Sequence, residues 1–168
     1  MNVEALPKFL NGLSYRQAIW LVPVAYAVHI LEESQHFAAW ASTNFTGGFT
    51  TTQFVKNNLI IMSILVALTL LVSVYPRRWT ALLHFFQISA VLFHNALFHM
   101  AATAYIGIYS PGLLSAILLY VPVFYHVVKR GYREGLLPNG SAIAVFGVAG
   151  IAHAWFVYTQ LFTTGLRL

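Results

Sequence analysis

Long hydrophobic segments separated by short polar connections dominate the chain. A membrane-spanning helix needs about 20 consecutive apolar residues, and five segments reach that length. They lie near residues 17–41, 57–75, 79–104, 111–129 and 141–164. Because the connections are short, we expect an all-α membrane protein in which five transmembrane helices form one bundle and a single domain over residues 1–168.

The composition supports this class. The 168 residues are 59% hydrophobic and only 8% charged, and the mean hydropathy is +0.72. Soluble domains carry about 25% charged residues, so an ordinary soluble domain is excluded. The sequence contains no cysteine, which removes disulfides, thiolate catalysis and thiolate-bound metals from consideration.

The basic residues gather on one side of the predicted bundle. Lys56 and Arg167 fall on the other side. The larger group consists of Lys8, Arg16, Arg77, Arg78, Lys129, Arg130 and Arg133. This positive-inside bias predicts a cytoplasmic N-terminus and an outward C-terminus in an integral protein of the plasma (inner) membrane. The net charge of +5 is therefore a topology signal and does not indicate nucleic-acid binding.

One polar stripe interrupts the first hydrophobic segment. The run His29-Ile-Leu-Glu-Glu-Ser-Gln-His36 contains two of the four acidic residues of the chain. Its ionisable side chains are three, four and seven residues from His29, so a helix would present all of them on one face. Ionisable groups inside membrane helices are costly and usually functional. The stripe consists of His29, Glu32, Glu33 and His36.

A second polar stripe lies on the third hydrophobic segment. His94, Asn95 and His99 fall within an arc of roughly 140° on a helix and can face the first stripe across the bundle. In the fifth segment, His153 reaches a similar depth. We therefore expect polar groups from several helices to meet in the outer half of the membrane.

The leading hypothesis is a metal-dependent enzyme. Its ligands would be His29, Glu33, His36 and His99, with Glu32 as general base. Asn95 would orient the substrate or a ligand, and His94 and His153 are further candidates. Without thiolates, imidazole and carboxylate ligands suit zinc or iron. The Glu-x-x-His spacing also occurs in di-iron bundles, but the other predicted spans supply no carboxylate. We expect hydrolysis or hydration of a small lipophilic or lipid-like substrate.

Three other interpretations stay open. Glu32 and Glu33 could act without metal as an acid–base pair in an isomerase or cyclase, because adjacent carboxylates in low dielectric do not both ionise easily. The same groups could serve a non-enzymatic ligand-binding or proton-relay protein. They could also only join helices by hydrogen bonds worth about 1 kcal/mol each.

The motifs also resemble a known family. His29-Ile-Leu-Glu-Glu33, Asn95-Ala-Leu-Phe-His99, Tyr109-Ser-Pro-Gly112 and a helix bearing Pro122 are similar, in this order, to the HXXEE-domain family of small membrane proteins. The resemblance implies an integral-membrane bundle whose shared polar set is His29, Glu32, Glu33, Asn95 and His99. It implies no particular reaction.

Overall fold

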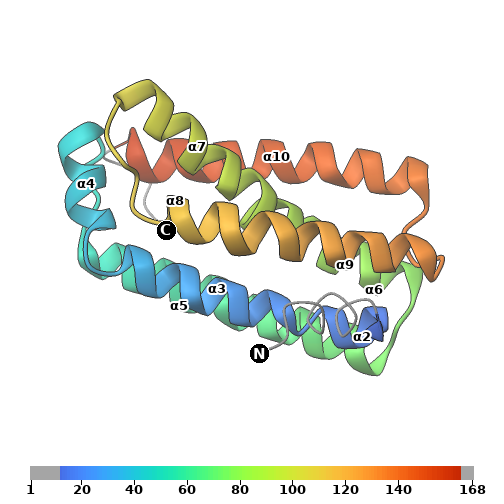
Figure 1. Ribbon diagram of the computed structural model, residues 1–168. Helices are drawn as coiled ribbons and strands as arrows, with labels where there is room; N and C mark the ends of the chain where they lie inside the picture. Colours follow the sequence, from blue (N-terminus) through green and yellow to red (C-terminus); the bar gives the residue numbers. More distant parts are fainter. Residues whose placement is uncertain (1–11, 164–168) are drawn as a thin grey trace.

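Four long helices form the body of the protein (Figure 1). The structure is a computed structural model that describes residues 12–163. The long helices are α5 (Thr51–Val74), Arg78–Ile106, Leu113–Arg133 and α10 (Asn139–Leu161), and each is long and apolar enough to cross a membrane. They confirm four of the predicted spans, with ends displaced by a few residues. The predicted end of the last span, at 164, lies just outside the described residues.

The first hydrophobic segment differs from the expected continuous helix over 17–41. It divides into α2 (Tyr15–Ala18), α3 (Leu21–Glu33) and α4 (Phe37–Asn44). Pro23 has no N–H and so stands in the first turn of α3, where none is needed. At the other end of α3, the Ser34 hydroxyl donates to the Leu31 carbonyl at 2.9 Å, and such bonds compete with helix continuation. A fifth membrane crossing by α2–α3 stays a prediction.

Two of the long helices contain a π-helical segment. Ser89–His94 joins α6 (Arg78–Ile88) to α7 (Asn95–Ile106), and Ala116–Tyr120 joins α8 (Leu113–Ser115) to α9 (Val121–Arg133). A π turn holds an extra residue and re-aims the side chains that follow it, and such turns are frequent at functional sites. The two segments contact each other inside the bundle.

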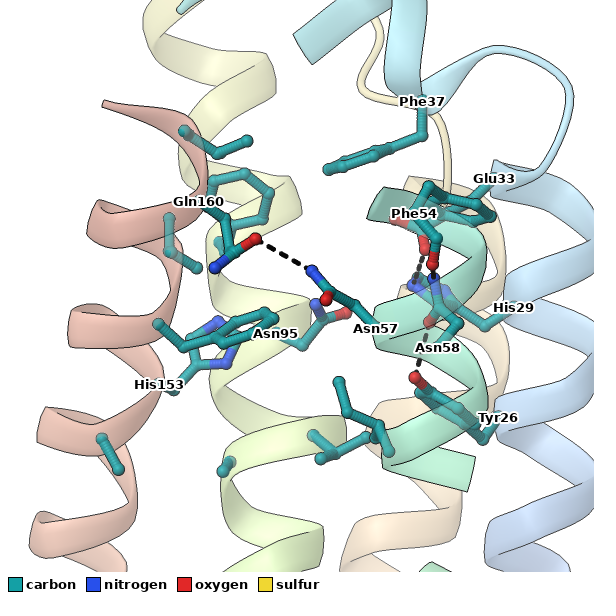
Figure 2. A pocket seen from close by; sticks show the side chains of 18 of the residues that line it. Tyr26, His29, Glu33, Phe37, Phe54, Asn57, Asn58, Asn95, His153 and Gln160 are labelled. Carbon is teal, nitrogen blue, oxygen red and sulfur yellow. Dashed lines mark hydrogen bonds and ion pairs between the residues drawn. The ribbon is translucent and has the colours of Figure 1, made fainter. Parts of the chain in front are cut away.

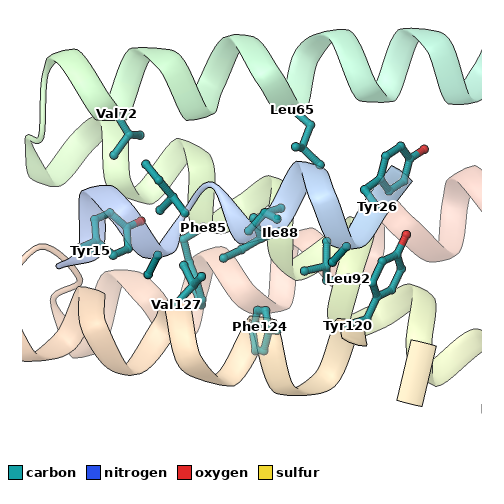
Figure 3. Close-up of a cluster of buried hydrophobic side chains, with 14 of the residues drawn as sticks. Tyr15, Tyr26, Leu65, Val72, Phe85, Ile88, Leu92, Tyr120, Phe124 and Val127 are labelled. Carbon is teal, nitrogen blue, oxygen red and sulfur yellow. The ribbon is translucent and has the colours of Figure 1, made fainter. Parts of the chain in front are cut away.

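The core lies between α2 and α3, α5, the α8–α9 helix, and α6 with its π-helical segment. Figure 3 shows its aromatic and aliphatic side chains filling the space between these helices. Tyr15, Ile19, Leu65, Ile88 and Leu92 are fully buried. Helix α10 packs against α6 and the adjoining π-helical segment, and this arrangement leaves room for a cavity further along the bundle.

The outer surface is apolar. Leu31, Ile143 and Ile151 are each at least 70% exposed, as expected of side chains that face lipid. The basic residues gather at one end, where Arg78 Nε donates to the Gly135 carbonyl at 3.3 Å. Lys8, from the larger basic group of the sequence analysis, and Arg167, from the smaller group, lie outside the described residues. The side of the membrane that this basic end faces stays a prediction.

Candidate metal centre

Three buried side chains from two helices converge on one point. His29 and Glu33 are one turn apart on α3, and His99 comes from α7. The Glu33 carboxylate lies 3.5 Å from His29 Nε2 and 3.3 Å from His99 Nε2, one imidazole at each oxygen. All three ligand atoms lie within 4.8 Å of one another. We call His29, Glu33 and His99 the triad.

The far nitrogen of each imidazole is held by a serine. His29 Nδ1 lies 2.9 Å from Ser115 Oγ, and His99 Nδ1 lies 2.9 Å from Ser110 Oγ. The Ser115 hydroxyl donates its own proton to the Gly112 carbonyl at 3.2 Å, so its oxygen is left to accept from His29 Nδ1–H. A bond of this direction would favour the tautomer that keeps the Nε2 lone pair free toward Glu33.

The three side chains form a group that could hold a metal ion. Within the part of the chain that the structure describes, neither triad Nε2 atom has a hydrogen-bond partner. An unprotonated Nε2 and a carboxylate oxygen repel each other, and a cation or a proton between them would remove that repulsion. Two ligand atoms on a tetrahedral zinc lie about 3.3 Å apart, because each bond is about 2.0–2.1 Å. The observed N···O separations of 3.3 and 3.5 Å, one to each carboxylate oxygen, are similar to that spacing.

Gly112 covers the triad from the loop between α7 and α8. Its backbone has φ +99°, and a Cβ there would lie 2.8 Å from His29 Cε1 and 2.9 Å from His99 Cε1. Only glycine adopts this conformation readily and also leaves that space to the imidazoles. The loop therefore closes one side of the triad with backbone.

Glu32 points away from the triad, onto the start of α8. Its carboxylate accepts backbone hydrogen bonds from the N–H groups of Gly112, Leu114 and Ser115, at 3.2, 3.3 and 2.8 Å. It also accepts from the Tyr109 hydroxyl. Desolvation raises the pKa of the Tyr109 phenol, and the bond to Glu32 raises it further. Glu32 therefore satisfies the N-terminus of α8, which carries Ser115, and fixes the preceding loop, which carries Ser110.

A cavity of about 250 Å³ borders the triad through His29 and Glu33. Figure 2 shows these two side chains on one side of the cavity and His153 and Gln160, from α10, on the other. Asn57 on α5 donates to Gln160 Oε1 at 2.9 Å across the space, and Tyr26 donates to Asn58 Oδ1 at 2.6 Å. The triad thus lies beside a space large enough for a small ligand.

The structure brings only part of the predicted stripes together. His36 is exposed, beyond the end of α3, and is not in the triad. His94 Nδ1 donates to the Ser89 carbonyl at 2.8 Å, and the His94 ring packs against Phe146. Asn95 and His153 line the cavity.

The sequence did not predict the residues that contact the triad from the α7–α8 side. Ser110, Gly112 and Ser115 surround the triad, although serines and glycines are too common in membrane helices and loops to stand out. The only available signal was the turn at Tyr109-Ser-Pro-Gly112, which follows His99 closely enough to fold back over it.

The comparisons with known proteins identify the family. A family model described as "Protein of unknown function with HXXEE motif" matches residues 20–127, and the chain belongs to this family. The predicted resemblance is therefore confirmed. The matched part includes the triad and its two serines, whereas α10 lies outside it. None of the curated proteins or solved structures matches the chain.

Proposed function

For this member of the HXXEE family, we propose that the triad holds a divalent metal ion, zinc or iron, inside the membrane. The protein then acts as an enzyme that hydrolyses or hydrates a small lipophilic substrate in the adjoining cavity. The observation that carries the proposal is the convergence of two unpartnered imidazole Nε2 atoms on one buried carboxylate. His29, Glu33 and His99 would be the ligands.

A bound metal of this kind would polarise a substrate oxygen and make water a better nucleophile. Three protein ligands are typical of catalytic zinc sites, which keep a further position for water or substrate. The cavity beside His29 and Glu33 gives such a molecule a place to bind. Surrounding helices exclude bulk water, since the triad residues are at most 6% exposed.

Under this proposal, the residues of the family motif have two different roles. His29 and Glu33 bind the metal, whereas Glu32 is a positioning residue rather than the general base. The support is its set of bonds to the α8 N-terminus, through which it places Ser115 against His29. Ser115 and Ser110 hold the imidazoles with Nε2 toward the carboxylate.

A metal-free acid–base centre is the second candidate, because the same distances allow an ion pair if one imidazole is protonated. Glu33 would then exchange a proton with His29 or His99 in an isomerase or cyclase. Both candidates use the same residues, so metal content separates them.

Metal analysis of the purified full-length protein tests the proposal. We expect about one zinc or iron per chain in the wild type and loss of this metal in His99→Ala and Glu33→Gln. His36→Ala is the matched control, because it removes an exposed histidine of the same motif region and should retain the metal. Absence of stoichiometric metal from the folded wild type, or its retention in His99→Ala, would refute the metal centre and leave the acid–base candidate.

A further inference from the structure

The wall of the cavity that faces the triad carries polar atoms without partners. Among the described residues, Asn95 Oδ1, His153 Nε2 and Gln160 Nε2 are buried and make no hydrogen bond. All three residues line the cavity, and Figure 2 shows them across from His29 and Glu33. Buried polar atoms are nearly always hydrogen-bonded in proteins. A polar group of a bound ligand would supply the partners that these atoms lack.

The chemistry of these atoms defines the group. Gln160 Oε1 already accepts from Asn57, so the free end of that side chain is a donor. Asn95 Oδ1 is an acceptor. His153 Nε2 can play either role according to its tautomer. A group that meets all three must both donate and accept hydrogen bonds, as a hydroxyl or a secondary amide does.

The other side chains around the cavity indicate the polarity and charge of the rest of the ligand. Phe37, Phe54, Phe98 and Phe156 are among the aromatic side chains that surround the cavity. In the part of the chain that the structure describes, no lysine or arginine lines it. At the wall opposite the triad, an anionic group would therefore enter an apolar space without a basic side chain to pair with it, which is costly. The lining favours a neutral, lipophilic molecule.

We propose that the cavity binds a small, neutral, lipophilic alcohol or secondary amide, whose polar group is held by Asn95, His153 and Gln160. This inference rests on the proposed function, because the triad on the opposite wall makes the bound molecule a substrate. It adds a recognition site on α10, which lies outside the segment that the family model matches. Substrate selection and metal binding thus come from different walls of the cavity.

Photo-crosslinking in lipid vesicles tests the ligand class with three matched probes: a diazirine-labelled dodecanol, the corresponding hydrocarbon and the corresponding carboxylate. We expect the alcohol to label cavity-lining peptides of α5 and α10 at least about fivefold more than the other two probes, which is the effect of roughly one net hydrogen bond. Equal labelling by alcohol and hydrocarbon, or preferential labelling by the carboxylate, would overturn the inference.

Two variants test the location. Gln160→Leu should remove the preference for the alcohol, and Ala152→Phe should reduce capture of every probe by filling the cavity, without removing a polar group. Gln35→Leu makes the same exchange as Gln160→Leu at an exposed position and should label like the wild type. An unchanged preference for the alcohol in Gln160→Leu, or undiminished labelling by all three probes in Ala152→Phe, would refute the assigned site.

Metal analysis of the same samples separates this inference from the proposed function. Selective labelling of the cavity by the alcohol in a protein without metal would refute the metal centre and support the ligand class. A protein with one metal per chain and no preference for the alcohol would support the metal centre and refute the ligand class.

Discussion

Replacing Gly112 by alanine tests whether the loop between α7 and α8 closes over the triad. The new methyl group would lie 2.8 and 2.9 Å from the Cε1 atoms of His29 and His99, and 3.0 Å from Glu33 Cγ. Ordinary carbon contacts are about 3.5–4.0 Å, so all three side chains would have to move. The His29 ring cannot shift freely, because it packs against Tyr120 with ring centroids 4.3 Å apart and bonds to Ser115.

Two costs contribute to the expected effect. A non-glycine residue at φ +99° costs of order 1–3 kcal/mol, and overpacking a buried site costs typically about 1–3 kcal/mol. We therefore expect Gly112→Ala to lower the free energy of unfolding by about 2–6 kcal/mol and to abolish metal binding. Unfolding in a detergent titration measures the first quantity, and metal analysis measures the second.

Gly107→Ala is the matched control. Gly107 has φ +74°, but a Cβ there would meet no atom within 4 Å among the described residues. This variant carries only the backbone cost of about 1–3 kcal/mol and should keep its metal. The reasoning about the triad would be refuted if Gly112→Ala were no less stable than Gly107→Ala and bound metal like the wild type.

Four further predictions follow from the centre and the topology. Ser115→Ala should weaken metal affinity about 10–100-fold by releasing His29; unchanged affinity in a chelator competition would argue against tautomer control. Glu32→Gln should lower the unfolding free energy by about 1–3 kcal/mol without changing the number of metal ions bound, whereas metal loss in the stable protein would make Glu32 a ligand. Prolonged chelation should lower the thermal unfolding midpoint of the wild type but leave that of His99→Ala unchanged; an equal shift in both would point to a site elsewhere. In intact cells an impermeant maleimide should label Thr52→Cys but not Arg77→Cys, and the opposite pattern would reverse the predicted orientation.

The sequence predicted that His29, Glu33 and His99 come together because their positions follow helical periodicity. His29 and Glu33 are four residues apart and share a face of α3, and His99 belongs to a polar stripe that had to avoid lipid. These three residues meet, as expected of two polar stripes that face each other across the bundle. The four long helices could also be predicted from the sequence, since hydrophobic length alone identifies them.

The rest of the centre depends on tertiary structure. His36 would have joined the stripe had α3 continued, but the helix ends at Glu33 and the turn after it leaves His36 exposed. Glu32 is about 100° around the helix from its neighbour, and that rotation directs it to the α8 N-terminus. No local sequence pattern indicates that Ser115 lies beside His29 in the folded protein.

The π-helical segment Ser89–His94 makes chain length itself a component of the centre. Its wide turn holds one residue more than α-helical winding would. If the same residues wound as a plain α-helix, everything after the segment would turn by about 100°, and His99 would leave the side of α7 that faces Glu33. A relative that lacks one residue in this segment can wind it as a plain α-helix and keep His99 on the same side. Alignments of the family therefore need to place a one-residue gap in this segment and not in the α-helix beside it, where the same gap would move the third ligand.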